Sequence, residues 1–345
     1  MGNPLDVIGY LYQRKPTRNS CKTGRIELVK EFGVVGLGRI GGGLGWQALR
    51  KGYKVVGIDL NTPSDDLVEE GITFSTDLSA LKELTSPRVV FLYIHAGPAV
   101  DEMIDKLVPI LDPGDIIVDG GNSYWGDSIR RAERIKQTGI HFVDLGTSGG
   151  VGGARNGACF MVGGNSTALD RLEPILLDLA QPGGYVRCGE SGSGHYVKLV
   201  HNGIEFGLLE AIGEGMHLME KFDQKLPVQD ILSCWQNGSV VRSWLIDLMK
   251  EQMDEQNGMD NIPGYIEDTG EVNWLISDAM RMEIPIPVIA QSVMQLFTSR
   301  DGTKDWAKAV AMMRHGFGGH PFGPKTELQE ERQTSRVGDI WRPTE

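Results

Sequence analysis

The sequence is poor in cysteine and has no long apolar run. Its 4 cysteines, spread over 345 residues, form no C-x-x-C pair and have no histidine at metal-ligand spacing. We therefore expect neither a disulfide framework nor a metal site, and a reducing, cytoplasmic compartment. No apolar run approaches the ~18 residues that a membrane-spanning helix needs, so we expect no membrane association of that kind. These cysteines are Cys21, Cys159, Cys188 and Cys234.

Positive charge is also in short supply. Lys and Arg number 34 against 46 Asp and Glu, which gives a formal net charge of −12. The field of such a chain repels nucleic acid and anionic lipid, so neither is expected as a partner. A small anionic ligand would need a local cluster of positive groups. The 40% hydrophobic and 23% charged residues are ordinary for a globular protein and exclude a disordered one.

Two types of pattern divide the chain. Residues 31–190 alternate short β-branched runs with amphipathic helical stretches, which predicts a Rossmann-type, doubly wound, mostly parallel sheet. Residues 191–325 predict an all-α domain, in which residues 199–221 are apolar on nearly every face and should form a buried helix. Residues 1–30 are an extension of unknown role and residues 326–345 a polar tail. The predicted strands cover residues 31–35, 54–58, 89–94, 116–119, 141–145 and 159–162.

A glycine-rich turn follows the first predicted strand. Val34-Val35 leads directly into Gly36-Leu37-Gly38-Arg39-Ile40-Gly41, and a helical stretch follows. In a dinucleotide-binding fold the first glycine makes the tight turn, the second admits the pyrophosphate, and the third lets the helix pack closely on the strand. The helix N-terminus then attracts the anion. We predict a cofactor-binding loop here; the alternative is a glycine turn with no ligand.

The second predicted strand ends in an acidic residue. Asp59 lies 18 residues beyond Gly41, where a carboxylate can accept hydrogen bonds from a ribose hydroxyl and would repel a 2′-phosphate. No arginine occupies positions 60–63. This pattern favours NAD over NADP, unless Asp59 only ends the strand or caps the next helix.

Four polar side chains form a narrow stripe on an otherwise apolar helix. Lys198, His201, Asn202 and Glu205 are spaced i, i+3, i+4 and i+7, which places them on one helix face. Burial of such groups is costly unless they are paired or used in function. Burial also favours the neutral amine of a lysine, the form that accepts a proton. The stripe therefore predicts a catalytic site; the alternative is a structural Lys198–Glu205 ion pair.

Two glycine-flanked segments follow later strands. Asn122 lies just beyond the strand at 116–119, and Ser148-Gly149-Gly150 just beyond the strand at 141–145. The carboxyl ends of strands form the ligand-binding edge of such sheets, and successive glycine amides can bind an anion. We expect both segments to converge with the polar stripe on one cleft.

Taken in order, these motifs resemble those of decarboxylating 6-phosphogluconate dehydrogenases. They are the glycine fingerprint, IIVDGGNS at 116–123, SGG at 148–150, KLVHNGIE at 198–205, VVRS at 240–243 and RHGFGGH at 314–320. The chain resembles the short form of the family, because it stops far before the end of the long form with its duplicated helical domain. The resemblance covers about residues 31–322, and the lysine helix and terminal segment distinguish the family from 3-hydroxyisobutyrate dehydrogenases.

The resemblance implies a mechanism for the stripe. Lys198 would take the proton from the C3 hydroxyl while hydride passes from C3 to the nicotinamide, and would then protonate the enolate oxygen as CO2 leaves. Glu205 would protonate C1 of the enediol. The product would be ribulose 5-phosphate, as in the pentose phosphate pathway.

The resemblance also implies binding positions, and with them NAD and a small phosphorylated sugar acid as ligands. The cofactor positions are Gly36, Leu37, Gly38, Arg39, Ile40, Gly41, Asp59, Ala96 and Asn122. The substrate positions are Asn122, Ser148, Gly149, Gly150, His201 and Asn202, with Arg242, Arg314 and His320 at the phosphate.

The terminal segment carries an implication for assembly. In the family it reaches the active site of the neighbouring subunit, so we expect a homodimer or a dimer-based tetramer in which Arg314 and His320 complete the partner's site. The chain departs from the family pattern elsewhere. Phe206 replaces a tyrosine of the long form, Asn273 stands where Lys or Arg is expected, and His95 is unusual at a strand end near the nicotinamide.

Two other functions are compatible with these patterns. A related enzyme would oxidise a 3-hydroxy acid with NAD and without decarboxylation. A regulator would bind NAD without turnover. The retained pair of Lys198 and Glu205 argues against the regulator, because a sensor needs neither residue.

Overall fold

The computed structural model describes residues 30–326, so the predicted N-terminal extension and nearly all of the predicted tail lie outside the described residues. The chain divides into two compact units, Met1–Lys198 and Leu199–Glu345. Within residues 30–326, no helix is long and apolar enough to cross a membrane.

The first unit is built on an eight-stranded sheet in the order β3-β2-β1-β4-β5-β6-β7-β8. Every neighbouring pair is parallel except β6 and β7. This confirms the predicted Rossmann-type sheet, and its strand order reverses between β1 and β4, the point at which such sheets bind ligands. The strands are β1 Glu31–Val35, β2 Lys54–Ile58, β3 Thr73–Ser75, β4 Val89–Leu92, β5 Ile116–Asp119, β6 His141–Ser148, β7 Ala158–Gly164 and β8 Ala180–Gly189.

Two strands were missed, and three were predicted with the wrong length. β3 has 3 residues and only partly buried side chains, so it lacks an apolar run. β8 contains Pro182-Gly183-Gly184, which is typical of a turn. β4 ends at Leu92, before the predicted Ile94, whereas β6 and β7 run beyond their predicted ends.

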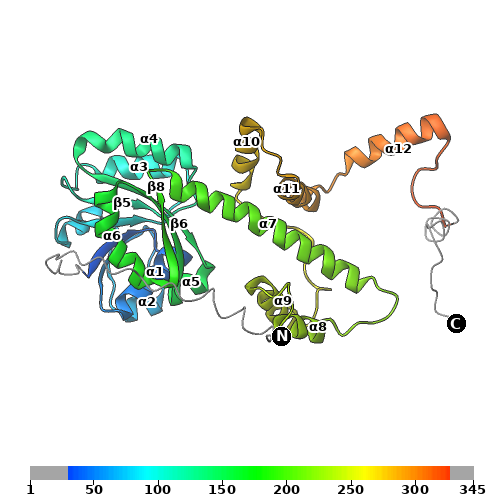
Figure 1. Ribbon diagram of the computed structural model, residues 1–345, viewed down its shortest axis with the longest axis horizontal. Helices are drawn as coiled ribbons and strands as arrows, with labels where there is room; N and C mark the ends of the chain where they lie inside the picture. Colours follow the sequence, from blue (N-terminus) through cyan, green and yellow to red (C-terminus); the bar gives the residue numbers. More distant parts are fainter. Residues whose placement is uncertain (1–29, 327–345) are drawn as a thin grey trace, which may run out of the picture. The chain divides into compact units, whose positions relative to one another are not determined.

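Both faces of the sheet are covered by helices (Figure 1). Helices α1, α5 and α6 contribute to the core on one face, and η3, α3 and α4 to the core on the other. Because helices cover both faces of the sheet, side chains on both sides of a central strand are buried. This explains continuous apolar runs such as VVFL in β4. The helical elements are α1 Arg39–Arg50, α2 Asp65–Glu69, η3 Leu78–Glu83, α3 Pro98–Leu107, α4 Trp125–Ile135, η4 Lys136–Thr138, α5 Gly150–Asn156 and α6 Ser166–Leu179.

The second unit is helical throughout its described part, as predicted. Helix α7 runs for 28 residues, Ser193–Glu220, from the first unit into the second. A small core around Met216, Leu232 and Ile246 joins α7 to the two helices that follow. Those helices and the remaining ones are α8 Val228–Gln236, α9 Trp244–Glu255, α10 Val272–Met282, α11 Pro287–Arg300 and α12 Asp305–Gly318.

The prediction that residues 199–221 form a buried helix is wrong for the single chain. Ile204, Leu208 and Leu218 on α7 are 53%, 50% and 73% exposed. Other helices of the unit cover only part of the α7 surface, for example at Gly203, where Leu275 of α10 lies against the backbone. In the single chain, α7 therefore carries exposed apolar side chains.

Candidate functional site

The glycine loop lies between β1 and α1. Gly36 has φ +93°, and a Cβ there would overlap the carbonyl oxygen of Tyr93, the residue that follows the neighbouring strand β4. A Cβ at Gly41 would overlap the carbonyl oxygen of Gly36. Gly38, in contrast, has open space within 4 Å of its Cβ position. The first and third glycines are therefore required by packing, and the second leaves the backbone accessible, which fits a bound pyrophosphate.

Asp59 lies against this loop. It follows β2, and its Oδ2 accepts a hydrogen bond of 2.7 Å from the backbone N–H of Leu37. Its Oδ1 accepts one of 2.9 Å from the N–H of Asn61. The structure thus brings the acidic residue and the glycine loop together, and the carboxylate is oriented by two backbone amides rather than buried by side chains.

Three further candidates lie where β4, β5 and β6 end. Ala96 and Asn122 are exposed, and Ser148 is half-buried at the last position of β6. Gly149 and Gly150 follow with φ +108° and +59°, conformations that favour glycine. Since these ends share one edge of the parallel part of the sheet with the glycine loop, the predicted cofactor residues are gathered at that edge.

The edge is held together by hydrogen bonds between neighbouring loops. The Tyr93 hydroxyl lies 3.0 Å from the Oγ1 of Thr147, which links the ends of β4 and β6. Burial raises the pKa of Tyr93, so this hydroxyl is neutral. Gly120, after β5, packs against the Tyr93 ring, where a Cβ would come within 2.5 Å of a ring carbon.

The start of α7 is fixed by a buried carboxylate. Asp144, in the middle of β6, accepts hydrogen bonds from the backbone N–H of Gly192 at 2.6 Å and of His195 at 2.9 Å. Its charge thus lies at the N-terminus of a helix, where it is favoured by the helix dipole. Asp144 was not predicted from the sequence, although an acid inside the apolar run FVDL at 142–145 was a signal for it.

Lys198 is packed against the same strand. A Cβ at Gly146 would come within 2.5 Å of the Cβ of Lys198, so only glycine at that position allows α7 to approach. The Lys198 residue is 8% exposed. The first carbons of the Lys198 side chain thus pack against β6, and this packing limits the positions that its amine can reach.

The other members of the stripe continue along α7. Asn202 is 5% exposed, and its Nδ2 donates a hydrogen bond of 3.4 Å to Glu271, which precedes α10. The Nδ1 of His201 lies 3.7 Å from Glu205 Oε2, and both side chains are about two-fifths exposed. The stripe therefore joins a buried amine and amide to an accessible imidazole–carboxylate pair, the groups that proton transfer to and from a bound substrate requires.

The expected phosphate ligands lie in the second unit. Arg242 is exposed between α8 and α9, and Arg314 is exposed on α12. His320 follows α12, and its carbonyl oxygen lies 2.7 Å from the Nδ1 of His315. Over residues 30–326, neither arginine forms an ion pair, so both guanidinium groups are available to an anion.

Three of the four cysteines lie within residues 30–326. Cys159, Cys188 and Cys234 are free thiols. In the part of the chain that the structure describes, no group of three or more His, Cys, Asp or Glu side chains could hold a metal ion.

Comparisons with known proteins agree with this geometry. Residues 31–192 match the family model of the NAD binding domain of 6-phosphogluconate dehydrogenase. Residues 194–334 match the model of the C-terminal domain of that enzyme. The chain belongs to the 6-phosphogluconate dehydrogenase family. The resemblance found in its sequence motifs is thereby confirmed.

Individual 6-phosphogluconate dehydrogenases match over most of the chain. It is 39% identical to the Bacillus subtilis protein YqeC, over 84% of this chain and 98% of that one. It is 36% identical to an NAD(+)-dependent, decarboxylating 6-phosphogluconate dehydrogenase of Haloferax volcanii, over 86% and 100%. The solved Plasmodium falciparum 6-phosphogluconate dehydrogenase is 27% identical, with a TM-score of 0.70, over 91% of this chain and 67% of that chain.

The structure also places the departures from the 6-phosphogluconate dehydrogenase pattern. Phe206 is half-buried on α7 and offers no hydroxyl. Asn273 is exposed in the first turn of α10, two residues after the Glu271 that contacts Asn202. Position 273 therefore carries a neutral side chain where the pattern predicts a base, and the nearby Glu271 is acidic. His95 is exposed at the end of β4.

Proposed function

We propose that this member of the 6-phosphogluconate dehydrogenase family oxidises and decarboxylates 6-phosphogluconate to ribulose 5-phosphate and CO2, with NAD as the preferred hydride acceptor. The observation that carries the proposal is the stripe on α7, in which a buried Lys198 shares a helix face with Asn202, His201 and Glu205. The Haloferax volcanii relative, which is matched over its whole length, is named as a decarboxylating 6-phosphogluconate dehydrogenase.

The proposed mechanism divides proton transfer between two side chains. The Lys198 amine accepts the proton of the C3 hydroxyl as hydride leaves C3. The resulting ammonium returns that proton to the carbonyl oxygen as the C1–C2 bond breaks and CO2 departs. Glu205, in its acid form, then protonates C1 of the enediol, while the hydroxyl at C2 of the enediol gives its proton back to the Lys198 amine and becomes the ketone of the product. The nicotinamide cofactor supplies the hydride acceptor, and residues 36–41 with Asp59 would hold it.

The reaction is tested with a substrate panel. Initial rates of NADH formation are measured with 6-phosphogluconate, gluconate and 3-hydroxyisobutyrate at equal NAD. We expect the highest kcat/KM for 6-phosphogluconate, since Arg242, Arg314 and His320 are proposed to bind its phosphate. A preference for 3-hydroxyisobutyrate would favour the non-decarboxylating alternative, and no turnover with any substrate would favour the regulator.

The preference for NAD is proposed from Asp59. Its carboxylate is held beside the loop by the amides of Leu37 and Asn61, so it is placed to accept a ribose hydroxyl and to repel a 2′-phosphate. A hydrogen bond to a charged group is worth about 1.5–3 kcal/mol, and we therefore expect kcat/KM for NAD to exceed that for NADP by tenfold or more. Asp59→Asn should reduce this ratio. Equal or better use of NADP by the unaltered protein would overturn the assignment.

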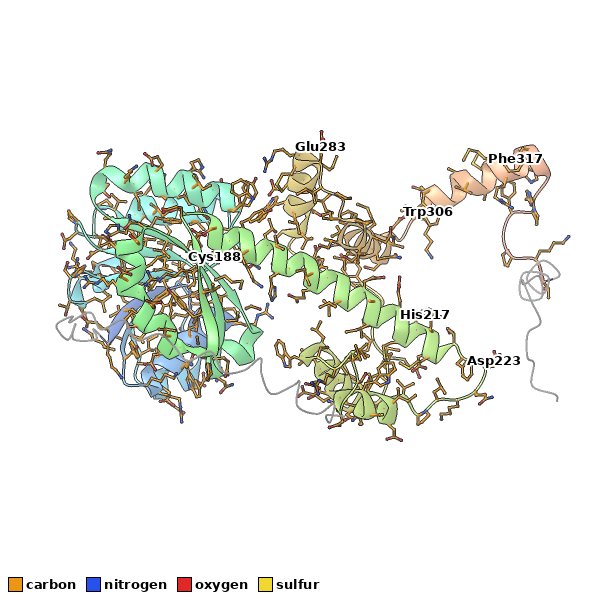
Figure 2. All side chains as sticks on the ribbon, viewed as in Figure 1. Cys188, His217, Asp223, Glu283, Trp306 and Phe317 are labelled. Carbon is orange, nitrogen blue, oxygen red and sulfur yellow. The ribbon has the colours of Figure 1, made fainter. Side chains whose placement is uncertain are left out.

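We propose a homodimer or a dimer-based tetramer with shared active sites. Helix α12 has no buried residue, although it carries large apolar side chains. Trp306 is 64% exposed and Phe317 76% exposed (Figure 2). Because Arg314 lies on the same helix, a second copy of the chain that covers this helix would also receive a phosphate ligand. The apolar surface of α7 supports the same interaction.

We also propose small-molecule ligands, a cytoplasmic location and a domain boundary ahead of α7. The net charge of −12 supports small-molecule ligands and no nucleic-acid partner. The scattered cysteines support a cytoplasmic location. The domain boundary is proposed at residues 190–191, ahead of α7, with the tail beginning near residue 326.

A further inference from the structure

The guanidinium group of Arg131 is completely buried beside α3 and β5. Arg131 lies on α4, and its side chain is 0% exposed. Its Nη2 donates hydrogen bonds to the carbonyl oxygen of Gly97 at 2.8 Å and to Asp101 at 3.0 Å. Its Nη1 donates to Asp119 at 3.4 Å. One side chain thereby bonds to the segments that follow two neighbouring strands, β4 and β5.

Each of these contacts organises a loop. Asp119, the last residue of β5, also accepts hydrogen bonds from the N–H of Gly121 at 3.2 Å and the hydroxyl of Ser123 at 2.7 Å. Its carboxylate therefore shapes the loop that contains Asn122. On the other side, Gly97 has φ +94° and caps α3, directly after Ala96.

The charges in this cluster depend on one another. Burial alone would raise the pKa of Asp101, but hydrogen bonds from Arg131 and Arg130 lower it to about 2. Asp101 is therefore ionised at neutral pH, and with Asp119 it surrounds a guanidinium that has no access to water. Removal of one partner from such a group leaves uncompensated buried charge. A lysine ammonium does not substitute, because it lacks the planar set of donors that reaches two loops at once.

We propose that Arg131 is a positioning residue for hydride transfer, because it fixes the 95–97 and 120–123 loops relative to each other. This inference rests on the proposed function, and it takes Ala96 and Asn122, the expected cofactor positions in these two loops, to contact the nicotinamide half of the cofactor. Arg131 itself touches neither cofactor nor substrate. The adenosine half would be held by residues 36–41 and Asp59. None of the contacts described above joins Arg131 to these residues.

The test compares Arg131→Lys with Arg130→Lys. Arg130 is the matched control, because it binds the same Asp101 from the next position on α4 but is 52% exposed. For Arg131→Lys we expect an unchanged Kd for ADP-ribose, weaker binding of NADH, and a larger primary isotope effect with substrate deuterated at C3. Since misplacement of reacting groups by about 1 Å can cost 10²-fold, kcat should fall by between tenfold and a hundredfold. Arg130→Lys should leave all four values unchanged.

Several outcomes separate this role from a purely structural one. A lower melting temperature with normal kcat and isotope effect would overturn the proposal, as would equal loss of ADP-ribose and NADH binding. If Arg131→Lys does not fold, Asp119→Asn removes one of its charged partners without a change in size, and the same expectations apply. If the unaltered protein does not turn over 6-phosphogluconate, the proposed function fails. The ratio of NADH to ADP-ribose affinity still decides whether Arg131 positions the loops.

Discussion

A Lys198→Met variant is expected to lose on the order of 10²–10⁴-fold in turnover while its affinity for NAD stays near that of the unaltered protein. Methionine keeps the unbranched stem that packs at Gly146, so α7 should remain in place. The variant lacks the amine that accepts the C3 hydroxyl proton. Rapid mixing with 6-phosphogluconate and NAD measures the loss directly, as the rate of NADH formation in the first turnover.

Glu205→Gln provides the contrast for this experiment. Under the proposed mechanism it blocks only the last protonation, so NADH should still form in the first turnover and the steady state should be slower. Retention by Lys198→Met of more than about a tenth of the original rate would remove it from the role of base. Unchanged steady-state turnover in Glu205→Gln would likewise remove Glu205 from the role of acid.

Mixing two inactive chains should restore activity. Lys198→Met and Arg314→Ala chains are each expected to be poorly active alone. If the phosphate ligand comes from the neighbouring subunit, one site of every heterodimer combines an intact Lys198 with an intact Arg314. Random association of equal amounts puts about half of the chains in heterodimers, so activity should reach about a quarter of that of the unaltered protein.

The controls for this mixture concern assembly. Chains with different affinity tags show by co-purification whether heterodimers have formed. A mixture of Lys198→Met with Glu205→Ala should gain nothing, because both residues belong to one α7 and each heterodimer site lacks one of them. Heterodimers of the first pair without recovery, or a fully active monomer, would contradict the shared site.

The sheet was predictable where strands are buried on both faces. Short apolar runs such as those of β1 and β4 predict buried strands. The glycine loop between strand and helix predicts the first crossover connection of the parallel sheet. β8 was not predictable, because Pro182-Gly183-Gly184 has the local chemistry of a turn and only pairing with β7 makes it a strand. The exposure of α7 was also not predicted. The sequence shows that the helix is apolar, but it does not show whether side chains of the same chain or of another molecule cover that surface.

The candidate site was predictable where its residues form a local pattern in the sequence. The spacing of residues within the glycine loop, from that loop to Asp59, and along the α7 stripe indicates which ligand or reaction each could serve. The burial of Asp144 and Arg131 was not predicted, because a single charged residue in a strand or helix is usually exposed to solvent. Their burial arises from contacts over long distances in sequence, such as that of Asp144 with His195.

If this chain couples oxidation to loss of CO2, the two products must form together. The most direct measurement uses 6-phosphogluconate labelled with ¹⁴C at C1 and compares the CO2 released with the NADH formed in the same reaction. We expect equal amounts of labelled CO2 and NADH throughout the time course. NADH formed without labelled CO2 would contradict this expectation and would assign the chain to the oxidation of a hydroxy acid alone.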